Sequence, residues 1–312
     1  MLDDVEQLDS NSGVVSAPLS IDPSTFLQNF DARAFYVEHQ LAQHPLLQLP
    51  AIAALSERLP EALMEWNSEQ DGAFTQPNLL KPHHLSCKDT ILSLEEQPAR
   101  VLLLQIENDP PYKQLMDELL NTIAPLSEQR RPGMWQRQAF LFLSSRAAYT
   151  PFHFDPDYNF LLQVRGHKTI HMWDPANRFV LPATALDNYY AGIGVPADQA
   201  QYANRAQQYR EEFLASAWHL PMKAGQGVHF PLHAPHAVTT ESDVSVSLSI
   251  TFRTRRSQAN AMVHGANAHV RRLGISPPAP GASRLWDTVA SVGYRGVRKT
   301  ASLAKRVLPG SR

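Results

Sequence analysis

The chain has almost no cysteine. Cys87 is the only one among 312 residues, so no disulfide can form within the chain. The paired cysteines of structural zinc sites are missing for the same reason. This cysteine usage favours a reducing compartment, and we expect a cytoplasmic protein.

Long apolar runs are also missing, and so is a basic amino-terminus. Residues 1–6 read Met-Leu-Asp-Asp-Val-Glu, whereas a secretory signal begins basic and continues with an apolar stretch. No apolar run approaches the ~20 residues that a transmembrane helix requires. We therefore expect no transmembrane segment, and we interpret the polar, aperiodic residues 1–17 as a flexible leader.

Residues 150–168 contain a cluster of chemically informative side chains. The segment is predicted to form two strands joined by a turn, and His153 lies two residues before Asp155. Because alternate side chains of a strand share a face, the imidazole and the carboxylate should point at one spot. Together they would supply two of the three protein ligands of a metal site.

A third ligand is available in residues 227–238, between a glycine turn and a β-rich run. This segment holds three histidines: His229, His233 and His236. Two histidines and one carboxylate with open coordination positions are the characteristic ligand set of non-haem iron(II) oxygenases. The pattern of the segment leaves open which histidine joins the site.

From about residue 100 to residue 253 the chain resembles the JmjC and cupin-like 2-oxoglutarate oxygenases, especially their asparaginyl-hydroxylase-like branch. That family has a His-x-Asp pair, with a Thr three residues before the His, an Asn six after it and a Lys fifteen after it. The same offsets in this chain hold Thr150, His153, Asp155, Asn159 and Lys168. The resemblance implies that Lys168, helped by Thr150, binds the distal carboxylate of 2-oxoglutarate.

The family's second histidine lies near the end of a Pro-x-x-[Trp]-x-His segment. Residues 231–236 match this segment in length but lack its aromatic pair. The resemblance therefore points to His236 as the third Fe(II) ligand, beside His153 and Asp155, and away from His233.

Three further positions concern the cosubstrate. Thr251 lies fifteen residues after His236, where asparaginyl-hydroxylase-like enzymes use an Asn near the cosubstrate. Arg253 shares the strand face of Thr251 and is a rival partner for the distal carboxylate, since other 2-oxoglutarate oxygenases use an Arg on a late strand. Leu102 stands at about the position where related hydroxylases place a Tyr. We therefore expect the cosubstrate to be bound more weakly or in a different arrangement.

The resemblance implies a mainly β protein with α-helices, built on a double-stranded β-helix of the cupin or jelly-roll type. The 43% hydrophobic content is enough for one sizeable core with appended elements. We place a helical N-terminal flank at 18–99, the barrel at 100–255 and a basic C-terminal extension at 256–312. A helical insertion at 191–217 is a candidate lid or substrate wall.

Apolar patterns predict individual elements within this plan. Strands are expected at 101–106, 138–143 and 244–252, the last with aliphatic residues on one face and Ser or Thr on the other. Helices are expected at 89–97, 112–126 and 201–217. His83 and His84 are interpreted as part of a solvated loop, because adjacent residues diverge on a strand or a helix.

The end of the chain is strongly basic. Residues 253–312 hold twelve Lys or Arg against one acid, Asp287, so this segment carries +11 and the rest of the chain −13 within a total of −2. Apolar residues from Leu285 to Val307 recur at helical spacing, which predicts a basic amphipathic helix. It would bind an anionic partner, a nucleic acid or a membrane surface, or else dock on the acidic body. A homodimer also stays open.

Taken together, these features predict an Fe(II)- and 2-oxoglutarate-dependent dioxygenase that hydroxylates a C–H bond. Its substrate would be a peptide or protein side chain or a small molecule, with demethylation as a weaker option. Two alternatives share the barrel: a non-catalytic cupin-like binding or regulatory module, and a metal-dependent enzyme of other chemistry, such as an isomerase. A lysine near the metal favours the oxygenase, whereas a pocket sealed by aromatic side chains favours the module.

Overall fold

The computed structural model describes residues 18–68, 81–82, 84–146, 148–194, 209–241 and 244–307, with the backbone alone at 81–82 and 297–307. The predicted leader 1–17, His83 and residues 201–208 of the helix predicted at 201–217 lie outside the described residues. From that predicted helix, residues 211–216 form a short 3-10 helix, Glu211–Ser216.

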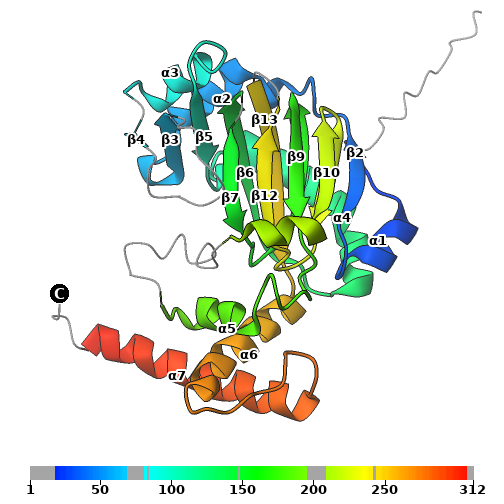
Figure 1. Cartoon of the computed structure of the whole chain (residues 1–312). Coiled ribbons are helices and arrows are strands. Elements are labelled where there is room, and N and C mark those ends of the chain that lie inside the picture. Colours follow the sequence, from blue (N-terminus) through cyan, green and yellow to red (C-terminus); the bar gives the residue numbers. More distant parts are fainter. Residues whose placement is uncertain are drawn as a thin grey trace, which may run out of the picture.

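Two antiparallel sheets form the core (Figure 1). Its eight strands are β6 (Trp135–Ser145), β7 (Tyr149–His153), β8 (Tyr158–Arg165), β9 (His167–Met172), β10 (Trp218–Lys223), β11 (Gln226–Phe230), β12 (His236–Thr240) and β13 (Val244–Arg253). One sheet contains the order β11-β8-β13-β6, and the other has the order β10-β9-β12-β7. Because the chain passes repeatedly from one sheet to the other, the sheets wind around a common interior. The predicted double-stranded β-helix is confirmed.

Strands from the N-terminal segment widen the larger sheet to nine strands. One edge gains β2 (Phe35–His39) and β1 (Leu19–Ser20), and the other gains β5 (Ala99–Leu103), β3 (Met64–Ser68) and β4 (Lys81–Pro82). The flank predicted to be helical is therefore mixed, with α1 (Pro23–Asn29), α2 (Leu49–Ser56) and α3 (Cys87–Leu92) between strands. Of these strands only β5 was expected from the sequence, because the others are short runs of two to five residues.

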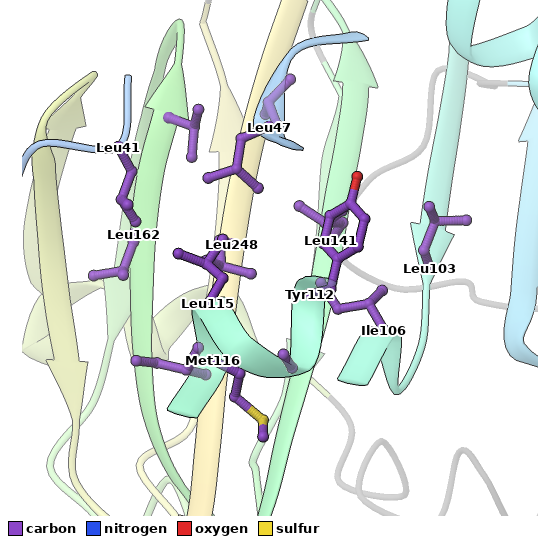
Figure 2. Close-up of a cluster of buried hydrophobic side chains, with 14 of the residues drawn as sticks. Leu41, Leu47, Leu103, Ile106, Tyr112, Leu115, Met116, Leu141, Leu162 and Leu248 are labelled. Carbon is purple, nitrogen blue, oxygen red and sulfur yellow. The ribbon is translucent and has the colours of Figure 1, made fainter. Parts of the chain in front are cut away.

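Helices cover the outer face of the larger sheet. Figure 2 shows Tyr112, Leu115 and Met116 of α4 (Pro110–Arg130) packed against Leu162 of β8 and Leu248 of β13. The aliphatic face of β13 belongs to this cluster. Its serine and threonine face is therefore turned towards the smaller sheet, because side chains alternate along a strand.

Some predicted boundaries need correction. The helix expected at 89–97 is α3, which ends at Leu92, and the strand expected at 101–106 is β5, which ends at Leu103. Gln105 has a left-handed backbone with φ 49°, which turns the chain away from the sheet before α4 begins. The helix predicted at 112–126 is longer at both ends.

Three helices lie below the barrel in Figure 1: α5 (Ala183–Ala191), α6 (Arg255–Arg271) and α7 (Arg284–Val307). A capping box between Thr254 and Ser257 starts α6 directly after β13. The main contacts of α7 are with α6. Among the described residues, no helix is long and apolar enough to cross a membrane.

Candidate metal centre and adjoining cavity

Three potential ligands meet where β7 ends and β12 begins. His153 closes β7, His236 opens β12, and the two residues are paired directly across the strands. Asp155 follows β7 by two residues. The Nε2 atoms of His153 and His236 each lie 3.8 Å from a carboxylate oxygen of Asp155. These distances are too long for hydrogen bonds, but one ion between the three groups would reach all of them.

Hydrogen bonds to backbone carbonyls orient both imidazoles. Nδ1 of His153 lies 2.7 Å from the carbonyl of Pro151, and Nδ1 of His236 lies 3.0 Å from that of Ala234. A carbonyl only accepts, so each Nδ1 carries a proton, and in the neutral imidazole Nε2 then keeps its lone pair. The lone pairs face Asp155, as metal-binding histidines require. The residues present therefore fit a divalent metal.

Asn159 fixes the carboxylate of this cluster. Its amide nitrogen donates to Oδ2 of Asp155 at 3.0 Å, and its amide oxygen accepts from the hydroxyl of Ser249 at 2.8 Å. Asn159 is predicted to bind the cosubstrate. In the structure its amide is engaged by these two neighbours, so we assign it to positioning Asp155.

The other two histidines of the 227–238 segment lie elsewhere. Nε2 of His233 is 2.6 Å from the hydroxyl of Tyr190, and the backbone of His233 is left-handed, with φ 65°. His229 is buried against Phe30, and burial lowers its pKa to about 4. Only His236 of the three shares a cluster with His153 and Asp155 among the described residues.

A cavity of about 300 Å³ runs between the two sheets from this cluster. Thr150, Asn159, Lys168 and Thr251 all line it, together with His153 and His236. Thr251 comes from the hydroxyl face of β13. Its Oγ1 atom is buried and has no hydrogen-bond partner among the described residues, so it is available to a ligand.

Lys168 is the buried cation of the cavity. It lies on β9, where side chains alternate as predicted, with Lys168, Ile170 and Met172 buried. Burial, and to a smaller extent the nearby charge of Arg100, lowers the pKa of the Lys168 ammonium to about 7. No described residue forms an ion pair with Lys168. A buried ammonium of this kind is stabilised by an anionic ligand.

Arg253 does not line this cavity. Its guanidinium pairs with the carboxylate of Asp157, on the turn between β7 and β8. Strand alternation predicts that it shares a face with Thr251, which does line the cavity. However, the ion pair occupies its charge, so the structure offers no role for Arg253 as the partner of the cosubstrate.

The sequence interpretation overlooked two charged residues of the cavity. Arg100 and Glu65 line it beside Leu102, whose position in the cavity agrees with the expectation. Arg100 lies two residues before Leu102 on β5. Glu65 lies on the neighbouring strand β3, directly opposite Leu102. Period-2 alternation around Leu102 would have revealed Arg100. Glu65 was hidden because β3 was not predicted.

A double-stranded β-helix with two histidines and a carboxylate at its cavity defines a cupin-type barrel with a candidate metal centre. Residues 56–258 match the family described as Cupin-like domain. Since this match covers more than half of the chain, the chain belongs to the cupin-like domain family, as its resemblance predicts.

This chain is similar to a structure of YcfD, a ribosomal oxygenase from Escherichia coli. The alignment covers 94% of this chain and 68% of the YcfD chain, with 13% sequence identity and a TM-score of 0.46. For a second structure of E. coli YcfD, the alignment covers 89% of this chain and 67% of the YcfD chain, with 14% sequence identity and a TM-score of 0.47. These scores are low, and no conclusion about this chain rests on them. No curated protein matches the chain in sequence.

Proposed function

We propose that this protein is an Fe(II)- and 2-oxoglutarate-dependent oxygenase that hydroxylates a C–H bond. The observation that supports this function is one cavity that combines the His153, Asp155 and His236 cluster with the buried ammonium of Lys168. A divalent metal beside a buried cation suits a ligand that chelates through one end and ends in a carboxylate. 2-Oxoglutarate has this form.

Each residue has a defined task in this proposal. His153, Asp155 and His236 would hold Fe(II), which supplies the redox chemistry by which dioxygen oxidises both 2-oxoglutarate and the substrate. Asn159 keeps the Asp155 carboxylate in place. Lys168 binds the distal carboxylate of 2-oxoglutarate, and the hydroxyls of Thr150 and Thr251 donate hydrogen bonds inside the cavity.

The non-catalytic module is less well supported. Phe140, Phe142 and Phe230 line the cavity, but so do Lys168 and Arg100, and about 300 Å³ stays open between them. A cavity with two cations next to a metal cluster fits a chelating dicarboxylate better than it fits a sealed structural ion. The substrate proposed for hydroxylation is a peptide or protein side chain, or a small molecule. The cytoplasmic location and the homodimer stay predictions.

An anaerobic titration tests the proposal. Fe(II) and 2-oxoglutarate added to the intact protein should produce the metal-to-ligand charge-transfer band, and oxygen should then yield succinate. Asp155→Ala and His236→Ala should lose metal binding, measured directly by calorimetry, because two ligands hold a labile divalent ion poorly. His233→Ala should keep it.

A matched surface control is His219→Ala on β10, which should also keep metal binding even if burial makes His233→Ala unstable. Metal binding without 2-oxoglutarate binding would favour the structural module. Metal binding that survives His236→Ala would overturn the ligand assignment.

A further inference from the structure

One side of α7 is fixed on α6. The indole of Trp286 donates to the side-chain oxygen of Asn267 at 2.9 Å, and the hydroxyl of Tyr294 donates to the carbonyl of Tyr190 on α5 at 3.1 Å. Gly265 of α6 permits this packing, since a Cβ there would lie 2.2 Å from the ring of Tyr294. Helix α7 therefore presents a defined opposite side to solvent.

That opposite side is aliphatic. Leu285, Val289 and Val292 are 77%, 58% and 64% exposed, and their i, i+4, i+7 spacing places them in one row along the helix. Among the residues whose side chains the structure describes, five of the ten exposed large hydrophobic ones lie between residues 273 and 292. Exposed apolar residues are thus concentrated on α7 and on the connection that leads to it from α6, as expected for a contact surface.

The same helix carries uncompensated positive charge. Arg284 and Arg295 are exposed, and within the described part of the chain neither forms an ion pair. The only acid, Asp287, accepts hydrogen bonds from the backbone of Gly281. In the sequence, residues 297–307 add Arg298, Lys299, Lys305 and Arg306. The helix is therefore apolar along one row and basic elsewhere.

We propose that α7 is an interfacial helix that binds the surface of an anionic lipid bilayer. Its aliphatic row would enter the boundary between headgroups and acyl chains, and its basic residues would contact the headgroup phosphates. A nucleic acid would use the charge but not the exposed aliphatic row. Docking on the acidic body, the other interpretation of this segment, accounts for the side of α7 that packs on α6 and contacts Tyr190, but it leaves the aliphatic row exposed.

Vesicle flotation with the full chain tests this proposal without reference to catalysis. The protein should float with vesicles of phosphatidylcholine containing roughly 30% phosphatidylglycerol, and not with phosphatidylcholine alone. Raising the salt from about 0.1 M to about 1 M should release it, because the Debye length shrinks from ~10 Å to ~3 Å.

Substitutions on the exposed row provide the decisive comparison. Leu285→Ser, Val289→Ser and Val292→Ser should each weaken partitioning about tenfold, and the triple variant should not float. All three side chains are solvent-exposed, so the fold should persist. The matched control is Leu92→Ser, a 49% exposed leucine on α3, and this variant should float normally. Helix α3 lies at the opposite end of the molecule from α7 in Figure 1.

Several outcomes would overturn the proposal. They are failure of the full chain to float with the anionic vesicles, equal flotation with both compositions, and flotation of the triple variant. A dimer that light scattering detects without vesicles and that the triple variant dissociates would assign the row to a second copy of the chain. Salt-sensitive binding of a single-stranded RNA oligomer that persists in the triple variant, with no vesicle binding, would assign the helix to nucleic acid.

Discussion

The affinity for 2-oxoglutarate should fall steeply as the pH rises above neutrality. The buried ammonium of Lys168 has a pKa of about 7, well below its usual value of 10.5, so the empty cavity releases this proton near neutral pH. Only the charged form attracts the distal carboxylate. Roughly nine-tenths of the Lys168 side chains are charged at pH 6 and roughly one-tenth at pH 8. The dissociation constant should therefore rise about tenfold for each pH unit above the pKa.

Proton uptake gives a second, independent measure of the same effect. A bound carboxylate stabilises the ammonium and raises its pKa, so at pH 8 the protein should take up nearly one proton per 2-oxoglutarate bound. Calorimetry on the Mn(II)-loaded protein in phosphate and in Tris would reveal this uptake, because the two buffers release protons with different enthalpies. Saturating metal throughout separates this proton from those of the histidine ligands.

Two variants test whether Lys168 is the residue that binds the distal carboxylate. Lys168→Arg keeps its charge at every pH of the experiment and should flatten the pH dependence. Arg100→Gln removes the second cause of the lowered pKa, so the midpoint should move to higher pH. A wild-type affinity that is constant from pH 6 to pH 9, with no proton uptake, would refute the assignment of Lys168 to the cosubstrate.

Three further perturbations have defined outcomes. Asn159→Ala should weaken metal binding by about ten- to a hundredfold, because the Asp155 carboxylate loses the amide that orients it; unchanged Mn(II) affinity by calorimetry would contradict this. Lys168→Met should raise the melting temperature of the unliganded protein at pH 6, where the unpaired ammonium is charged inside the barrel. This gain should shrink as the pH rises from about 7 towards 10.5, because lysine is then neutral in the unfolded chain as well as in the folded one, and a constant gain would argue against burial as the cause. Gly265→Ala should destabilise the protein by about 1–3 kcal/mol, because its Cβ meets Tyr294, and a melting curve like the wild type would show that α7 moves away freely.

The core of the candidate site follows from local spacing in the sequence. His153 and Asp155 lie two residues apart next to a strand, so they share a direction whatever the rest of the chain does. The alternation of β9 likewise places Lys168 with Ile170 and Met172, on a buried face. These inferences need only the geometry of one strand, and the structure agrees with both.

The geometry of a single strand could not show which of His229, His233 and His236 joins the metal cluster. The pairing of β12 with β7 places His236 opposite His153, whereas the left-handed backbone at His233 sends that side chain to Tyr190. Family resemblance indicated His236, but the physical cause is a pairing between strands about eighty residues apart. The ion pair of Arg253 could not be predicted either, because its partner Asp157 lies on a turn 96 residues earlier in the chain.

For the C-terminal helix, the sequence by itself determined the amphipathic period and the excess of positive charge, because both depend only on residues within one helix. Tertiary packing determines which of the apolar side chains of α7 are covered. Gly265 admits the ring of Tyr294 to the surface of α6, and that contact sets the rotation of α7 and leaves Leu285, Val289 and Val292 in solvent. Periodicity identifies an apolar face, but only the neighbouring helix determines how much of that face stays free.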